Sequence, residues 1–358
     1  MSTLDFNAQT APNNRSMTHS NRGSGATDTC VPAEKVLVAI PALNEASHIR
    51  ECLESLLSDP WIAGTRVVVA DGGSTDDTCA IVTAMIADHA ALSLIQNPAR
   101  LQAAAINKIV RECSDQNTEF VIRCDAHAIY PQRYVARVAQ ALSDLPEAAS
   151  IVTPMDAVGT GCFQRAAAWV ADTPLGSGGS AHRGGQRSGW VDHGHHAGFR
   201  VDWFRRIGGY DESFSHNEDA EFDRRLTQAG GRIRLDADIR LDYSMRPTLL
   251  KLTKQYWFYG RGRARTVTKH RMRPRNRQLI PAVNFAALAL SLIATPVFPP
   301  LLFFPAAYRV LLVAVSAIAT MRLRTLCGLW AGAALGAMHN AWGAGFLWQM
   351  ILGNRVIR

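Results

Sequence analysis

The most constraining feature of this sequence is the separation of its charges along the chain. The last acidic residue is Asp242, and the 116 residues after it hold 16 Lys and Arg but no Asp or Glu. The first 242 residues carry 22 Lys and Arg against 30 Asp and Glu, so an acidic part is joined to a strongly basic one. Basic residues flank membrane segments on the cytoplasmic side and meet anionic lipid. The pattern predicts a membrane-facing tail and argues against nucleic acid as a partner, because nucleic-acid proteins more often carry their basic patch on the folded domain.

The tail is also apolar over lengths that suit membrane helices. Residues 279–304 carry no charge, 310–321 continue after Arg309, and 327–353 are uncharged apart from one histidine. About 20 apolar residues cross a bilayer, so we expect two or three membrane helices within 279–358, the first broken or re-entrant at its prolines. A buried hairpin of a soluble domain is the alternative. The charge beside the first segment predicts a multi-pass protein of the inner membrane with its N-terminal domain in the cytoplasm.

Two further segments flank the folded part. Residues 1–30 are rich in Ser, Thr, Asn and Gly, lack the apolar core of a secretory signal, and are interpreted as a disordered leader. Residues 246–278 form a basic connector, in which ten Lys and Arg between Lys251 and Arg277 surround the aromatic cluster at 256–259. Such a composition is typical of an amphipathic segment at the lipid headgroups.

The cysteines give no sign of a covalent or metal framework. There are seven, an odd number, and no two of them have a C-x-x-C spacing. This argues against a set of disulfides and against a structural zinc site. The simplest interpretation is a reducing compartment.

Residues 31–245 alternate short β-branched runs with amphipathic stretches of about ten residues, a pattern that predicts strands alternating with helices. Ser74 and Asp77 have the spacing of a capping box at the start of the second helix. Right-handed crossovers then give an α/β domain with a mostly parallel sheet flanked by helices. A Gly-rich stretch at 176–198 predicts a long loop over the site. The predicted strands are 36–40, 66–70, 92–95, 120–124 and 232–235.

Polar residues follow three of these strands at the point where each ends. The first strand is followed by Pro41–Glu45, the second by Asp71–Ser74 and the fourth by Asp125–His127. Ligands of parallel sheets bind beyond the carboxyl ends of the strands. Each segment alone reads as an ordinary turn, but three at one edge indicate a binding site.

These residue types suit the transfer of a sugar from a nucleotide diphosphate sugar. Asp71 can accept hydrogen bonds from the base or ribose, while Asp125 and His127 can hold Mn²⁺ or Mg²⁺ against the diphosphate. Asp219, next to Glu218 at a predicted helix start, is a candidate general base for an inverting transfer. Both carboxylates could instead be helix caps.

The motifs, in this order and approximate spacing, resemble those of family 2 glycosyltransferases with the GT-A fold. They are Pro41-Ala42-x-Asn44-Glu45, Asp71-Gly72-Gly73-Ser74, Asp125-x-His127 and Asn217-Glu218-Asp219, within about residues 35–240. The stretches 123–131 and 255–262 resemble the ExoA-type enzymes of succinoglycan biosynthesis, which are membrane-bound β-1,3-glucosyltransferases. The resemblance implies a catalytic pair of Asp219 and Glu218, with the metal at Asp125 and His127. It implies nucleotide-sugar contacts from Pro41, Ala42, Asn44, Glu45, Asp71, Gly72, Arg100, Asn107 and Asp125.

The resemblance also implies the reaction. It indicates that one sugar, glucose from UDP-glucose, is added to a lipid-linked oligosaccharide in exopolysaccharide biosynthesis, with other polysaccharide-assembly proteins as candidate partners. Gln255 and Arg261 are assigned to an acceptor or gating segment. A processive polymer synthase normally carries Gln-x-x-Arg-Trp, whereas Gln255 is followed by Tyr-Trp-Phe-Tyr. Single-sugar addition is therefore favoured.

Three alternatives stay open from the sequence. The sugar could be transferred to polyprenyl phosphate, or the protein could be a non-catalytic, membrane-tethered module for anionic ligands. The chain also departs from its family at 191–196, where His193, His195 and His196 occur. A zinc site is one interpretation of these histidines, and polar loop residues near an acceptor groove are the other.

Overall fold

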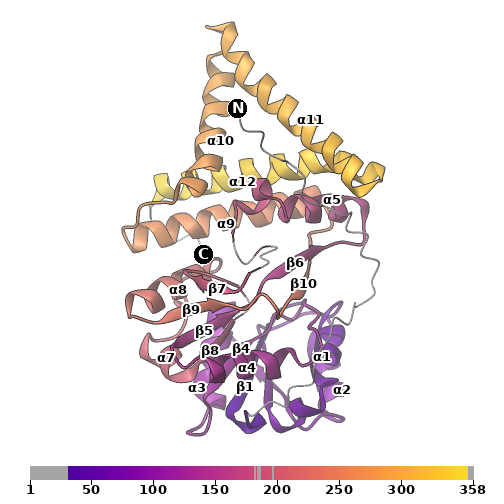
Figure 1. Cartoon of the computed structure of the whole chain (residues 1–358), viewed down its shortest axis with the longest axis vertical. Coiled ribbons are helices and arrows are strands. Elements are labelled where there is room, and N and C mark those ends of the chain that lie inside the picture. The colour runs from indigo at the N-terminus through magenta and orange to yellow at the C-terminus, as the bar shows by residue number, and fades with distance from the viewer. Residues whose placement is uncertain (1–30, 181–182, 184–186, 196, 354–358) are drawn as a thin grey trace, which may run out of the picture.

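A computed structural model of the chain describes residues 31–180, 183, 187–195 and 197–353 (Figure 1). The expected leader and His196 lie outside these ranges. The N-terminal part is an α/β domain whose eight-stranded sheet has the order β3-β2-β1-β4-β8-β5-β9-β7. The strands are β1 (Val36–Ala42), β2 (Arg66–Asp71), β3 (Leu92–Gln96), β4 (Phe120–Arg123), β5 (Ala148–Val152), β6 (Met155–Val158), β7 (Gly189–Val191), β8 (Ala197–Arg200), β9 (Arg232–Leu235) and β10 (Leu241–Ser244).

The sheet is mostly parallel, as expected. Strands β3, β2, β1 and β4 are parallel neighbours, as are β5 and β9, while β8 is antiparallel to both of its neighbours and β7 to β9. The helices of this domain are α1 (Ile49–Leu57), α2 (Thr78–Ile86), α3 (Gln102–Cys113), α4 (Tyr134–Asp144), α5 (Cys162–Ala171), α6 (Pro174–Ser177), α7 (Val201–Arg206) and α8 (Glu218–Gln228).

The central strands are buried on both faces, which explains their near-continuous apolar sequence. In β1, Val38 and Ile40 belong to the core cluster that includes residues of α1, α2 and α4. Leu37 and Ala39 point the other way, into the cluster that includes residues of α3, α7 and α8. The side chains alternate because successive residues of a strand face opposite sides of the sheet.

Most predicted elements are confirmed, with two local differences. The capping box is wrong, because α2 begins at Thr78 after Asp77, which makes no capping hydrogen bond, and the Ser74 hydroxyl donates to Asp71 instead. The Gly-rich stretch 176–198 is not one continuous loop, since β7 and the start of β8 lie within it. The parallel pair β6 and β10 forms a separate small sheet between the main sheet and the C-terminal helices (Figure 1).

Beyond the α/β domain, four long helices form a second layer. They are α9 (Leu249–Lys269), α10 (Asn276–Ala294), α11 (Phe303–Leu323) and α12 (Ala331–Leu352). Figure 1 shows α9 and α12 lying across the α/β domain, while α10 and α11 project away from it and converge at their joined ends. Pro299 and Pro300 begin a short 3-10 helix at this junction, so the first apolar stretch is broken there, as predicted. Pro281 lies inside α10 without ending it.

The helices α10 and α11 expose most of their apolar side chains. Within the described residues, two helices are long and apolar enough to cross a membrane: Asn276–Ala294, and Pro299–Leu323, which includes α11. Apolar patches of this size are rare on soluble monomers and typical of surfaces that meet lipid or protein. The exposed large side chains here include Ile280, Val283, Leu290, Leu292, Ile293, Val297, Phe298, Phe303, Val310, Val313 and Met321.

The third apolar stretch forms α12, which packs along α9. The two backbones approach closely at glycines: a Cβ on Gly260 would lie 2.1 Å from the carbonyl oxygen of Trp342, and one on Gly345 would lie 2.2 Å from that of Trp257. The basic connector is therefore largely a helix held against protein on one face. Its contact with lipid headgroups remains a prediction.

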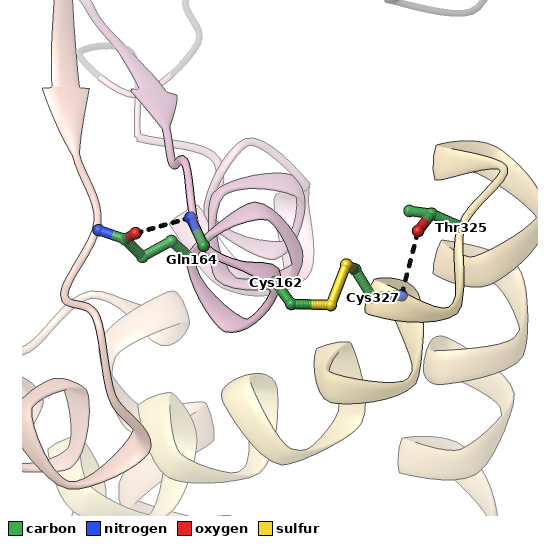
Figure 2. The surroundings of a disulfide bond; sticks show 5 residues. Cys162, Gln164, Thr325 and Cys327 are labelled. Carbon is green, nitrogen blue, oxygen red and sulfur yellow. Dashed lines mark hydrogen bonds between the residues drawn. A yellow bond between two sulfur atoms is a disulfide. The ribbon is translucent and has the colours of Figure 1, made fainter.

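One disulfide joins the α/β domain to this helical layer. Figure 2 shows Cys162, at the start of α5, bonded to Cys327 in the short 3-10 helix Leu326–Trp330 that precedes α12. The bridge closes a loop of 165 residues, which the chain-entropy model values at about 5 kcal/mol. The sequence argument against disulfides is wrong for this pair, and the inference of a reducing compartment loses its support. Sequence spacing could not reveal two cysteines that only the fold brings together.

This bond is open to a direct chemical test. After alkylation of the denatured, unreduced protein, we expect mass spectrometry to find the peptides of Cys162 and Cys327 linked to each other. Cys79 is free and only partly buried, so it serves as the internal control that is alkylated before and after reduction. Recovery of Cys162 and Cys327 as alkylated thiols without reduction would contradict the bridge.

Candidate active site

A pocket opens at the carboxyl ends of β1, β2 and β4, at the edge that the sequence indicated. Strand ends position it: β1 contributes Pro41 and Ala42, the turn after β2 contributes Gly72, and the turn after β4 contributes Asp125 and His127. Its remaining walls come from the turn after β1, from the loop between β3 and α3, and from the first residue of α3. The full lining is Pro41, Ala42, Leu43, Glu45, Gly72, Asn97, Arg100, Leu101, Gln102, Asp125, Ala126 and His127.

Asn44 and Asp71 do not line this pocket, but they hold the turns that form it. Asn44 has a left-handed φ of 56°, which Asn tolerates well, and its Oδ1 accepts the backbone N–H of Thr75 at 2.8 Å. Its own N–H donates to Ser74 Oγ at 2.8 Å, so the turns after β1 and β2 are tied together. Asp71 is 1% exposed and accepts from the backbone of Gly73 at 2.9 Å and from Ser74. Burial alone would raise the pKa of Asp71, but the hydrogen bonds from Ser74 and Gly73 hold it below its ordinary value.

The predicted metal residues lie together at one side of the pocket. Asp125 Oδ1 accepts from Gln102 Nε2 at 3.1 Å, and His127 Nδ1 lies 3.1 Å from Glu45 Oε1. Burial lowers the pKa of His127, but the Glu45 hydrogen bond and the charge of Asp125 outweigh it and raise the pKa above its ordinary value. Since a carboxylate commonly orients a metal-binding histidine in this way, Glu45 is suited to fixing the ring.

These donors fit a metal that the substrate helps to bind. Among the described residues, no group of three or more His, Cys, Asp and Glu side chains is placed to hold a metal ion by itself. Asp125 and His127 supply one carboxylate and one imidazole nitrogen. Mg²⁺ in nucleotide sites usually takes one or two protein ligands and completes its shell with phosphate oxygens and water. The donor set suits such a shared site.

Arg123 is the main functional residue that the sequence analysis missed. It is the last residue of β4, 2% exposed, and its guanidinium contacts three carboxylates. Its Nε lies 3.4 Å from Asp125 Oδ1, its Nη2 lies 3.4 Å from Glu218 Oε1, and its Nη1 pairs with Asp219. The sequence contained a clue to this role, since Arg123 is a charged residue at the end of an apolar strand. A charge buried in this way requires partners of opposite charge.

Arg123 therefore joins the predicted metal residue to the predicted base. Asp219 and Glu218 begin α8, after Asn217, whose φ is 66° and whose amide donates to Thr266 rather than capping the helix. Burial would raise the pKa of Asp219, but the charge of Arg123 holds it below its ordinary value. Burial and the neighbouring charge of Asp219 instead raise the pKa of Glu218. Environments that shift the pKa values of two adjacent carboxylates in opposite directions are typical of catalytic sites.

Of the unusual histidines, the two that the structure describes, His193 and His195, each lie beside an acidic residue of α8. His193 Nδ1 lies 2.7 Å from Asp223 Oδ2, which also accepts from the backbone N–H of Gly194. His195 Nε2 lies 3.5 Å from Asp219 Oδ2. Burial lowers the pKa of His195, so its neutral form is favoured beside the base. A small hollow next to Asp219 is lined by Arg123, Gly194, His195, Phe199, Tyr210, Asp219 and Asp223.

The other predicted residues divide between the pocket and its surroundings. Arg100 lines the pocket with a left-handed φ of 59°. Asn107 is not among the lining residues, and its Nδ2 donates to the carbonyl of Tyr210 at 2.8 Å, which ties α3 to the segment before α8. Arg261 Nε donates to Gln349 of α12 at 3.2 Å.

Gln255 faces a cluster of aromatic side chains between α9 and β10. Its Nε2 donates to the hydroxyls of Tyr243 at 2.7 Å and Tyr259 at 2.8 Å. The guanidinium of Arg183 lies 4.9 Å from the centre of the Tyr243 ring. Gln255 thus connects α9 to β10 through these tyrosines. Arg261 instead lies in the contact between α9 and α12.

Comparisons with known proteins agree with this geometry. The model of the family "Glycosyl transferase family 2" matches residues 37–208. The succinoglycan biosynthesis protein ExoA of Rhizobium meliloti is 39% identical over 342 residues, which cover 89% of this chain and 96% of that protein. A dolichyl N-acetyl-α-D-glucosaminyl phosphate 3-β-D-2,3-diacetamido-2,3-dideoxy-β-D-glucuronosyltransferase of Methanococcus voltae is 23% identical over 244 residues, or 65% of this chain and 74% of that one.

A solved structure shares the fold. The mannosyltransferase PcManGT of Pyrobaculum calidifontis, in complex with GDP-Man and Mn²⁺, has a TM-score of 0.56 and 20% identity, covering 88% of this chain and 87% of its own. The strand-end pocket, its acidic residues and the near full-length match to ExoA lead to one assignment. The chain belongs to the family 2 glycosyltransferases with the GT-A fold, as an ExoA-type member.

Proposed function

We propose that this protein is a membrane-bound, inverting glycosyltransferase that adds one sugar to a lipid-linked oligosaccharide in exopolysaccharide biosynthesis, with UDP-glucose as donor. The assembly of an exopolysaccharide is supported by the name of the ExoA relative, and the lipid-linked acceptor by that of the relative from Methanococcus voltae. The exposed apolar helices α10 and α11 support membrane insertion on the side away from the α/β domain.

The observation that carries the proposal is the arrangement of acids around Arg123. One guanidinium contacts Asp125, which lines the pocket, and Asp219, which lines the hollow beside it. A donor diphosphate near Asp125 and an acceptor hydroxyl near Asp219 would then lie on neighbouring sides of the same buried cation. This is the juxtaposition that direct displacement at an anomeric carbon requires.

The residues have distinct tasks in this transfer. The ionised carboxylate of Asp219 accepts the proton of the acceptor hydroxyl while the new bond forms between that oxygen and the anomeric carbon. The bond from this carbon to the donor phosphate oxygen breaks, and the nucleoside diphosphate leaves. When bound at Asp125 and His127, Mn²⁺ or Mg²⁺ would neutralise charge on the diphosphate. Arg123 holds Asp125 and Asp219 in place and keeps Asp219 ionised.

The test is sugar transfer by membranes that contain the protein. Membranes are incubated with a panel of labelled nucleotide sugars, and we expect label from UDP-glucose in the lipid fraction, with none after chelation of divalent metals. Labelled lipid in membranes without an oligosaccharide acceptor would instead indicate transfer to polyprenyl phosphate. If no labelled nucleotide sugar is consumed by the intact protein, the proposal is wrong.

The metal assignment gives a sharper prediction. Asp125→Asn should weaken metal-dependent binding of UDP-glucose by about tenfold, because a neutral amide is a poor ligand for a hard cation and a charge-assisted contact is lost. Titration of the donor with and without Mn²⁺ measures this effect. Asp88→Asn makes the same chemical change on an exposed side chain and should leave binding unchanged. Donor binding that depends equally on metal in wild type and Asp125→Asn would place the metal elsewhere.

A further inference from the structure

Three arginines meet where the α/β domain joins the first candidate membrane helix. Arg263 lies in α9, whereas Arg275 and Arg277 lie at the start of α10, and we call the three the arginine cluster. Helices α9 and α10 are neighbours here, because Ala264, which follows Arg263, shares a buried apolar cluster with Ala282 of α10. Burial and then the charges of Arg275 and Arg277 lower the pKa of Arg263, which agrees with three guanidinium groups that lie near one another. None of them belongs to the donor pocket.

The cluster lies close to the catalytic carboxylates. Helix α9 crosses the start of α8 in direct contact: a Cβ on Gly262 would lie 2.6 Å from both Asn217 Cβ and the carbonyl oxygen of His216. One turn further along, Thr266 Oγ1 accepts a hydrogen bond of 3.1 Å from Asn217. Arg263 follows Gly262 directly, and Asp219 is among the charges that act on it. The cluster is thus a neighbour of the proposed base.

The cluster carries more positive charge than its surroundings compensate. Arg275 pairs with Asp192, and Arg277 Nη1 donates to the carbonyls of Gly178 and Gly179 at 3.4 and 3.1 Å, which are neutral. Within the described part of the chain, Arg263 makes no hydrogen bond or ion pair. Burial and then the charges of Arg275 and Arg277 lower the pKa of Arg263 to about 10, despite the opposing charges of Asp223 and Asp219. A multiply charged anion would relieve this repulsion.

The surroundings also indicate what is attached to that anion. Arg275 immediately precedes α10 and Arg277 lies in its first turn, so the cluster stands at the end of a helix whose exposed surface is apolar. Figure 1 shows α10 leaving the domain from the side where α8 lies. A ligand held here would have its anionic group at the cluster, an apolar chain along α10 and a sugar toward Asp219.

We propose that the arginine cluster binds the phosphate groups of the lipid-linked acceptor and so presents the acceptor sugar to Asp219. This inference rests on the proposed function, and it names the chemical group by which the acceptor is recognised. Arginine suits the task because its planar fork donates two parallel hydrogen bonds to phosphate oxygens.

Binding of a simple probe tests the cluster apart from catalysis. The full-length protein in detergent is titrated with geranylgeranyl diphosphate, which has the phosphates and an apolar chain but no sugar. Arg263→Gln should weaken its binding by about tenfold, the effect typical of one lost charge-assisted hydrogen bond, and Arg263→Lys should weaken it less. Arg273→Gln is the matched control, since Arg273 is an exposed arginine of the same basic segment. It should bind the probe like wild type.

Competition experiments distinguish recognition of the acceptor phosphates from binding of a membrane headgroup. Hydrolysis of UDP-glucose in turn shows whether a variant has damaged the donor site. Inorganic pyrophosphate should displace the probe, whereas displacement by vesicles of phosphatidylglycerol alone would overturn the proposal in favour of a lipid-headgroup site. Hydrolysis of UDP-glucose without acceptor should be unchanged in Arg263→Gln. Loss of that hydrolysis in Arg263→Gln would also overturn the proposal. So would a weakening of probe binding by Arg273→Gln that equals the effect of Arg263→Gln. Absence of hydrolysis in wild type would contradict the proposed function and leave the binding result to judge the cluster.

Discussion

Asp219→Asn is expected to lower the rate of sugar transfer by about 10²–10⁴-fold, the range typical for removal of a general base, while donor binding persists. The amide has almost the shape of the carboxylate but cannot accept the acceptor's proton. Donor binding should survive because Asp219 lies outside the residues that line the donor pocket. The measurement is the transfer rate at saturating donor, together with donor affinity by titration.

Glu218→Gln is the informative companion to this variant. Glu218 contacts the same guanidinium and is 5% exposed, but it does not line the hollow beside Asp219. Its pKa is raised, so part of its population is already neutral, and the change to Gln should cost less activity than Asp219→Asn. If Asp219→Asn loses donor affinity along with rate, Asp219 is a nucleotide ligand or a structural residue. If it loses neither, the base lies elsewhere, and His195 becomes the first residue to test.

The first half of the fold could be predicted because its strands are long apolar runs. Strands β1 and β2 are buried on both faces, so their sequences lack polar interruptions, and their ends carried the motifs of the site. Strands β6, β7 and β8 have three or four residues each, and each contains an Asp or a Gly, residues that are depleted in strands. Such segments show neither a measurable period nor a β-branched run, and pairing with distant strands decides their structure.

The residues that connect the site escaped prediction for a related reason. Arg123 stood beside the Asp125 motif, but its partners Glu218 and Asp219 are about a hundred residues away, and only the packing of α8 against β4 brings them together. The hydropathy of the tail indicated apolar helices, yet it could not distinguish α12, whose glycines pack against α9, from a helix that faces lipid. Asn107 matched its family's pattern, although in the fold it ties α3 to Tyr210.

Replacement of Arg123 by Met should destabilise the protein by about 3–5 kcal/mol, the cost of breaking a buried ion pair by removing one partner. Asp125, Glu218 and Asp219 would lose their shared cation, and all three are buried or nearly so. Arg50→Met is the matched control. Arg50 pairs with Glu54 on the exposed face of α1, where an ion pair contributes about 0–1 kcal/mol. Denaturant unfolding of the detergent-solubilised proteins measures both effects.

The pH dependence of this loss identifies its cause. In the wild type, the depressed pKa of Asp219 adds stability at pH values above its unfolded pKa, and that stability is lost as pH falls through the folded pKa. Without Arg123, burial raises the folded pKa of Asp219 above its unfolded value. The variant should therefore be most destabilised above that raised pKa and recover as pH falls, when protonation removes the buried charge. A larger loss at pH 8 than at pH 5 is the expected result. An equal loss at both pH values would mean that Arg123 stabilises the fold through the packing of its side chain rather than through its charge.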